Sequence, residues 1–218
     1  MKTRESGLKF VRIATFTEHL PGPGICSGMV KMREPAGARS ARYSEAMMGK
    51  PLANEAAEYY WTYIGKVEGD DVVAALERQT AEFGALLGRV SEEASRHRYE
   101  AGKWSVREAV GHINDTERVF AFRALWFARA LGAELDSMDQ EVCVQHAGSD
   151  GVSMAALAAE FAAIRASTLA MVKSLPEEAW LRTGVASGKT VSVRALVWII
   201  CGHVEHHARI LRERYGLS

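Results

Sequence analysis

Two histidines near the carboxyl end of the chain, His203 and His207, have the spacing of metal ligands. Residues four apart in a helix lie on the same face, one above the other. That face is otherwise apolar, so both imidazole rings are expected in the protein interior. Its apolar members are Val193, Leu196, Ile200, Val204 and Leu211. A buried imidazole without a partner costs about 1–3 kcal/mol, so each ring must bind something.

A third histidine, His112, lies at the edge of the apolar stripe of an earlier predicted helix. Three imidazoles from two facing helices suit a divalent transition metal such as zinc, nickel or iron, and three protein ligands leave a position open for a substrate. His206 points about 100° away from His207 around the helix and is expected in solvent. On spacing alone one alternative stays open, in which three separate core histidines bond to neighbouring hydroxyl or carbonyl groups.

The elements that must position these histidines are predicted to be four long amphipathic helices, because apolar residues recur at three- and four-residue steps. They span about residues 70–90, 105–131, 153–174 and 192–215. Ser105 and Glu108 form a capping-box pattern at the start of the second helix, and Gly132 is expected to end it. No segment shows the alternation of a strand. The sequence therefore predicts an all-α fold, an antiparallel up-down-up-down four-helix bundle, whose second and fourth helices are adjacent at the histidines.

The composition excludes several classes of function. The chain has 27 basic and 27 acidic residues, so its zero net charge gives no attraction to nucleic acid or to an anionic membrane. Its longest apolar run, residues 195–201, is far shorter than the roughly 20 residues of a spanning helix. Three widely spaced cysteines give neither a disulfide framework nor a cysteine-pair metal site. We therefore expect a cytoplasmic protein that acts on a small molecule, without a nucleic-acid or membrane partner.

The chain divides near residue 50. Residues 1–50 carry nine Lys or Arg against four Glu, six of the 19 glycines and three of the five prolines, and they show no sustained helical or strand period. Such a segment buries too little apolar surface to offset its chain entropy, so it is predicted to be disordered. Alternatively, translation begins at Met47 or Met48 and the extension is not native. Residues 51–218 are then the folded domain.

Several stretches of the chain resemble the DinB-like superfamily over about residues 60–216. They are KWSVRE (103–108), GH (111–112), ERVFAFRAL (117–125), TVSVRAL (190–196), GHVEHH (202–207) and LRERY (211–215). The resemblance implies a metal-binding four-helix bundle of the DinB/YfiT type. Carried onto this sequence, it implies that His112, His203 and His207 hold the ion, the three residues that helical spacing selects.

The resemblance also implies an activity. Relatives include thiol-S-transferases that use bacillithiol, mycothiol or glutathione, among them a maleylpyruvate isomerase, so a low-molecular-weight thiol is the expected cosubstrate. The expected cofactor is a divalent transition metal, zinc or nickel. Arg123 lies about three turns beyond His112 on the same face and is a candidate for binding a carboxylate of the thiol. The alternative for Arg123 is a salt bridge inside the bundle.

Two other functions stay open on the sequence: a metal-dependent hydrolase, and a non-catalytic bundle whose metal stabilises the fold or a homodimer. A hydrolase would be favoured by a carboxylate near the metal. Asp115 and Glu117 are near His112 in sequence, but neither clearly faces it, and Asp115 is expected at the surface.

Four further residues are weaker candidates for the site. Cys201 lies about 160° from His203 on the helix and is not expected to share the metal. Cys143 and His146 are expected in a loop near the cleft. Trp104 is expected to pack at a helix start and not to line the site.

Overall fold

The computed structural model describes residues 45–218. Residues 1–44 of the extension that the sequence predicts to be disordered lie outside the described residues. The described part begins with α1 (Glu45–Met48). The carbonyl oxygen of Met48 accepts a hydrogen bond of 3.1 Å from the indole nitrogen of Trp198, and Met47 and Met48 pack against the core. The residues around the alternative start site therefore contact the bundle.

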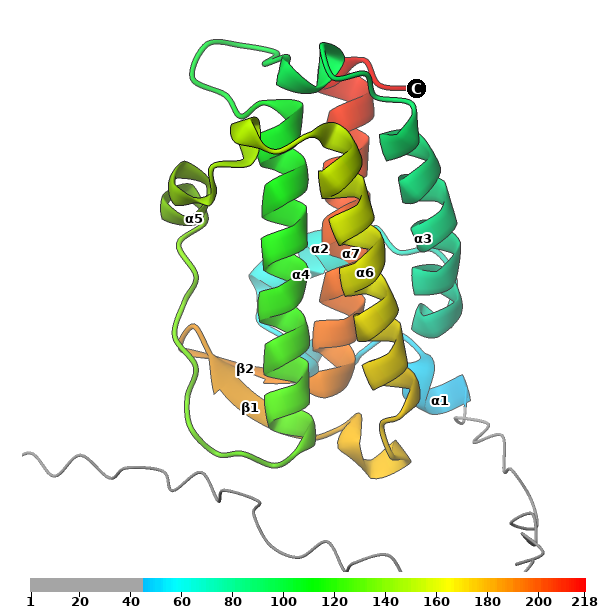
Figure 1. The fold of residues 1–218 in the computed structure, drawn as a ribbon. Coiled ribbons are helices and arrows are strands. Elements are labelled where there is room, and N and C mark those ends of the chain that lie inside the picture. The colour runs from blue at the N-terminus through cyan, green and yellow to red at the C-terminus, as the bar shows by residue number, and fades with distance from the viewer. Residues whose placement is uncertain (1–44) are drawn as a thin grey trace, which may run out of the picture. The chain divides into compact units, whose positions relative to one another are not determined.

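Four long helices form the bundle, which confirms the predicted all-α four-helix fold (Figure 1). They are α3 (Val72–Gly88), α4 (Val106–Ala128), α6 (Met154–Lys173) and α7 (Val193–Tyr215). Each helix is preceded by a capping residue whose side-chain oxygen accepts a hydrogen bond from a backbone N–H group in the first turn. These residues are Asp71, Ser105, Ser153 and Ser192. Ser105 and Glu108 form the predicted capping box. α4 ends at Ala128, four residues before Gly132, because Ala130 adopts a left-handed backbone conformation with φ of 56°.

The order of helix directions differs from the expected up-down-up-down pattern. The Ser105 hydroxyl, which caps α4, donates a 2.5 Å hydrogen bond to Asp150, which shortly precedes α6, so both helices start at the same end of the bundle. Residues 129–153 return along the bundle, through α5 (Gln140–Ala147), to make this possible (Figure 1). α4 and α6 therefore run parallel, and each packs against a second helix that runs the other way. Helical periodicity does not show where a long connection leads.

A short β-hairpin before α7 also departs from the prediction that no strand is present. β1 (Thr183–Ala186) pairs antiparallel with β2 (Lys189–Ser192). Ser187 and Gly188 between them have φ of 55° and 68°, as a tight two-residue hairpin turn requires. Strands of four residues are too short to display a recognisable alternation. The returning connection pairs with this hairpin, because the amide of Leu135 donates to the carbonyl of Val185 at 3.0 Å.

Short helical turns complete the described fold. They are η1 (Ala53–Glu55), η2 (Glu58–Tyr60), α2 (Trp61–Ile64), η3 (Ala94–Arg96), η4 (Ser149–Gly151) and η5 (Glu177–Ala179). α2 crosses α7 very closely, because a Cβ atom added to Gly202 would lie 2.2 Å from the carbonyl oxygen of Tyr63. Glycine at this position therefore lets α2 place its aromatic residues against α7.

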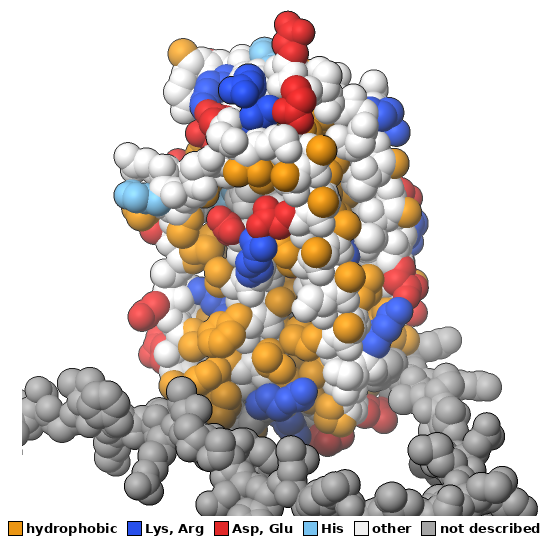
Figure 2. Space-filling view, in the orientation of Figure 1, with side chains coloured by type: hydrophobic (Ala, Val, Ile, Leu, Met, Phe, Trp, Pro, Cys, Tyr) orange, Lys and Arg blue, Asp and Glu red, His pale blue; other side chains and the backbone are white. Residues whose placement is uncertain are grey.

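The interior contains two hydrophobic clusters. It also contains a buried ion pair between α4 and α6. Arg165 of α6 is fully buried and donates to both carboxylate oxygens of Glu117 of α4, at 2.9 and 2.8 Å. Among the described helices only α6 is long and apolar enough to cross a membrane by length and composition. It packs against α3 and α4, and 33% of its apolar window is buried in the structure. Figure 2 shows hydrophobic side chains over α4 and α6, where Phe122 and Leu125 are exposed.

Candidate metal centre

The three predicted histidines converge on one point between α4 and α7. Nε2 of His203 lies 3.2 Å from Nε2 of His112 and 3.1 Å from Nε2 of His207. One ring nitrogen from each residue lies within 4.8 Å of the others. His112 and His203 are each only 4% exposed. The structure therefore brings together a pair from one helix and a single residue 91 positions earlier.

These spacings fit a bound metal ion. Nitrogens held at about 2.0–2.1 Å from one tetrahedral ion lie about 3.3 Å from each other. The two Nε2 separations in the structure are close to that value. A core histidine that is satisfied by the protein directs its ring nitrogen at an oxygen, whereas these nitrogens face one another. Three imidazoles without a carboxylate or thiolate suit a transition metal better than calcium or magnesium.

Burial keeps the three rings in the form that binds metal. Desolvation lowers the pKa of His112 to about 4 and that of His207 to about 3, and neighbouring histidines add to both shifts. The pKa of His203 is also lowered well below its usual range, mainly by burial. All three rings are therefore neutral near pH 7, so their nitrogens have lone pairs available without the loss of a proton.

The second nitrogen of His112 has a partner that the sequence reasoning missed. Nδ1 of His112 lies 3.4 Å from the hydroxyl oxygen of Thr116, one turn further along α4. A proton on Nδ1 directed at this oxygen leaves Nε2 free to coordinate. The four-residue spacing to a buried threonine was the available signal.

Neither carboxylate near His112 in sequence serves the histidines. Asp115 lies 3.4 Å from Arg118 at the surface, as expected. Glu117 is buried and accepts two hydrogen bonds from Arg165. Both carboxylates are therefore engaged by arginines.

The remaining candidates lie outside the cluster. His206 is half-buried against Tyr63, with ring centroids 5.4 Å apart, and so is less solvated than expected. Cys201 is 1% exposed, and burial raises the pKa of its thiol to about 12. Cys143 and His146 belong to α5 and not to a loop, because Asp139 caps a helix there. The His146 ring lies 2.8 Å from the carbonyl oxygen of Val142.

A pocket of about 280 Å³ opens beside His112 and His203 and also contains Arg123. The rest of its lining comes from α4, the segment 59–63, the returning connection and the hairpin turn. These residues are Tyr59, Tyr60, Tyr63, Thr116, Val119, Phe120, Ser137, Met138, Gln140 and Ser187. Among the described residues, none of those lining this pocket is Asp or Glu. Of this lining the sequence identified His112, Arg123 and His203, but the segments outside α4 and α7 lack a periodic pattern that would have placed them here.

Arg123 is held by main-chain and hydroxyl groups and not by an acid. Its Nη2 donates to the carbonyl oxygen of Asp136 at 2.6 Å and to the Ser187 hydroxyl at 3.3 Å. Its guanidinium carbon lies 5.6 Å from the ring centroid of Phe120. Within residues 45–218 no carboxylate forms a salt bridge with it, so the salt-bridge alternative has no support there.

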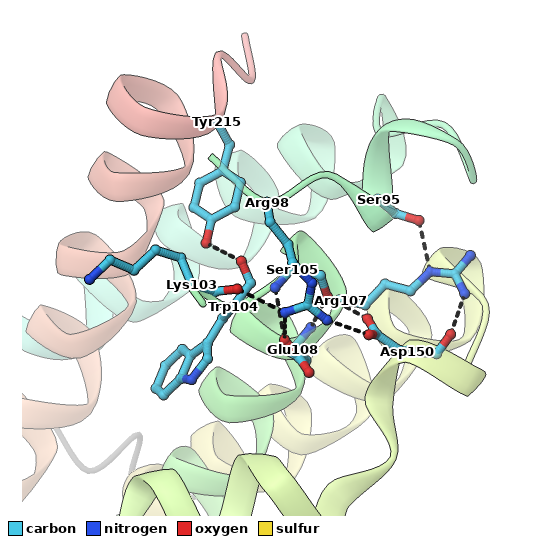
Figure 3. A network of polar contacts seen from close by, with 9 residues as sticks. All are labelled: Ser95, Arg98, Lys103, Trp104, Ser105, Arg107, Glu108, Asp150 and Tyr215. Carbon is cyan, nitrogen blue, oxygen red and sulfur yellow. Dashed lines mark hydrogen bonds and ion pairs between the residues drawn. The ribbon is translucent and has the colours of Figure 1, made fainter. Parts of the chain in front are cut away.

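A second pocket, of about 300 Å³, adjoins His207. Its walls include Trp104, Lys103, Glu141 and Tyr215, so Trp104 does line a pocket, contrary to expectation. The Trp104 ring lies 4.8 Å from that of His112, and the Tyr215 hydroxyl donates to the Trp104 carbonyl oxygen at 2.7 Å. Figure 3 shows Lys103 and Trp104 extending to the same side of their loop, below Tyr215. The histidine cluster is thus approached by two pockets that have no lining residue in common.

A polar network anchors the loop that carries Trp104 (Figure 3). Arg98 bonds to Glu108 at 2.5 Å and to Asp150 at 2.6 Å, and Asp150 also accepts the Ser105 hydroxyl. These contacts tie the start of α4 to the segment before α6. The wall of the second pocket is therefore fixed to the bundle.

Comparisons with known proteins bear on the fold and the family of the chain. No curated protein matches the chain. Among solved structures, YfiT from Bacillus subtilis matches with a TM-score of 0.60 and 16% identity, over 79% of this chain and 99% of that chain. YfiT is described as a probable metal-dependent hydrolase with an unusual four-helix bundle topology, and at this identity the match shows the fold. The DinB superfamily profile matches residues 75–211, which contain all three histidines. The chain therefore belongs to the DinB superfamily.

Proposed function

We propose that this protein is a metal-dependent enzyme that transfers a low-molecular-weight thiol, of the bacillithiol, mycothiol or glutathione type, to a small electrophile. His112, His203 and His207 hold the ion, which is zinc or nickel. The observation that carries the proposal is the open pocket beside the histidines, whose described lining contains no Asp or Glu. We expect the reaction to take place in the cytoplasm, where thiols are kept reduced.

The absence of a carboxylate from the described lining favours a thiol over water as the nucleophile. A divalent ion in this site supplies Lewis acidity, which lowers the pKa of a thiol or a water molecule that binds it. A free thiol has a pKa near 8.5 whereas that of water is about 15.7, so a thiol ionises with less help from a general base. In the transfer, sulfur forms a bond to an electrophilic carbon, the leaving group departs with its electron pair, and the thiol proton passes to solvent.

The other pocket residues bind and shield the reactants. Tyr63 packs its ring 5.5 Å from that of His203, and its hydroxyl lies 2.9 Å from that of Tyr59. Burial raises the pKa of Tyr63, so its hydroxyl stays protonated. Phe120 and Tyr60 meet edge to face at 6.2 Å and form an apolar wall that excludes water.

A hydrolase on the same histidines is the second candidate, and one observation favours it. Glu141 lines the pocket beside His207, where its carboxylate accepts a 3.3 Å hydrogen bond from the Trp104 indole. A carboxylate in that pocket is a candidate general base for water. The third candidate is a non-catalytic bundle whose metal is only structural. It predicts a metal site without an adjoining cavity, whereas two pockets adjoin the histidines.

The test is a panel of bacillithiol, mycothiol, glutathione and coenzyme A with a model electrophile, assayed by loss of free thiol with the metal-loaded protein. We expect turnover with at least one thiol, and loss of turnover in His207→Ala but not in His206→Ala. Inactivity with every thiol, together with ester or amide hydrolysis that Glu141→Gln abolishes, would instead establish the hydrolase.

A further inference from the structure

Arg123 is a buried cation without a matching anion. It is 4% exposed, and burial lowers the pKa of its guanidinium group. Its Nη2 donates hydrogen bonds to the Asp136 carbonyl oxygen and the Ser187 hydroxyl. Its Nε and Nη1 have no hydrogen-bond acceptor among residues 45–218. A charge that is removed from water without a counterion is costly unless a ligand supplies one.

The pocket around Arg123 does not supply that counterion. No Asp or Glu is among its described lining residues. A divalent ion on the histidines adds further positive charge to the same space. An occupant with a negative charge would therefore satisfy both ends of the pocket.

The distances in the pocket restrict the size of this occupant. The centroid of Phe120 lies 5.6 Å from the guanidinium carbon of Arg123 and 6.4 Å from the ring centroid of His203, so Phe120 is close to both groups. The volume of about 280 Å³ is at the lower end for small-molecule sites. A short-chain carboxylate fits this volume.

We propose that the small electrophile is a carboxylate, held by Arg123 with its reactive carbon directed toward the histidines. This assignment rests on the thiol transfer proposed above. The guanidinium group binds the carboxylate through the N–H groups that the protein leaves without an acceptor, in a charge-assisted contact. Phe120 and Tyr60 contact the apolar chain between the two ends of the substrate. The thiol then has the second pocket, beside His207, for the remainder of its structure.

The test measures binding directly, by calorimetry on the full-length, metal-loaded protein. The probes are pairs of equal size, butanoate with butanamide and succinate with succinamide. The acids should bind the wild-type protein at least tenfold more tightly than their amides. Arg123→Gln should remove that preference, and Arg123→Lys should restore part of it. Arg118→Gln is the matched control, because it removes a charge from the exposed side of the same helix and should leave the preference unchanged.

Three results would overturn the assignment. One is equal affinity of the wild-type protein for acids and amides, which needs no variant to fold. Another is a preference for acids that persists in Arg123→Gln, since the carboxylate would then be binding the metal. The third is tighter binding of inorganic phosphate than of any carboxylate. None of these depends on turnover, so they are distinct from failure of the thiol assay, which would refute the proposed function and leave carboxylate binding intact.

Discussion

Nε2 of His112 and Nε2 of His203 lie 3.2 Å apart, although the two residues are separated by 91 positions in the chain. This contact joins α4 to α7 at the level where the two pockets approach each other. His207 completes the group from one turn further along α7. The helices that position the histidines are thus also the helices that shape the space in which a substrate would bind.

The metal should bind with a stoichiometry near one divalent ion per chain, which elemental analysis of the purified protein will measure. His112→Ala, His203→Ala and His207→Ala should each remove most of it, because two imidazoles retain an ion weakly. His206→Ala should keep it, since that ring lies against Tyr63 outside the cluster. Loss of the ion from His206→Ala with retention in His207→Ala would refute the assigned ligands.

Acid should destabilise the metal-free protein. The pKa of His112 is lowered to about 4 and that of His207 to about 3, from an ordinary value of 6.5. Between pH 6.5 and 4 the unfolded chain binds protons that the folded protein does not, so the free energy of unfolding falls as the pH falls. Urea unfolding in the presence of a chelator, across this range, will measure the slope.

The control for this slope is the double variant His112→Gln and His207→Gln, which removes two of the titrating rings and should show a shallower dependence. A free energy of unfolding that stays constant between pH 6.5 and 4 in the unsubstituted protein would contradict the burial of neutral imidazoles.

Gly202→Ala should disturb the first pocket from outside it. The new Cβ would lie 2.2 Å from the Tyr63 carbonyl oxygen, so α2 must move and carry the Tyr63 ring away from His203. We expect a lower melting temperature and weaker substrate binding with an unchanged metal content. Gly84→Ala is the matched control: nothing lies within 4 Å of its added Cβ, and it should gain about 0.5–1 kcal/mol from helix propensity. Equal behaviour of the two variants would contradict the close α2–α7 contact.

A shortened chain that begins at Met47 should fold and bind metal as well as the full chain, because residues 1–45 have the composition of a segment that cannot form a core. The shortened chain keeps Met48, whose carbonyl accepts the Trp198 indole. Thermal unfolding and metal content of both chains will decide. A large fall in melting temperature would mean that the removed residues pack on the bundle.

The sequence by itself determined the four helices and the histidine pair, because both depend on relations between residues that are close in the chain. A capping residue such as Ser105 acts on amides within one turn, and the spacing of His203 and His207 places both rings on one face in any α-helix. His112 joins this pair when the apolar face of α4 packs against that of α7, as it does in the structure.

Only the tertiary structure decided the parallel course of α4 and α6, the hairpin at Ser187 and the position of the tyrosines from residue 59 to residue 63 over the site. It also placed Arg123 in a pocket without a carboxylate among the described lining residues, where the sequence had left a salt bridge open. The physical reason is that these features depend on the path of irregular segments. Such paths are set by contacts between residues distant in the chain, for which local periodicity and capping carry no information.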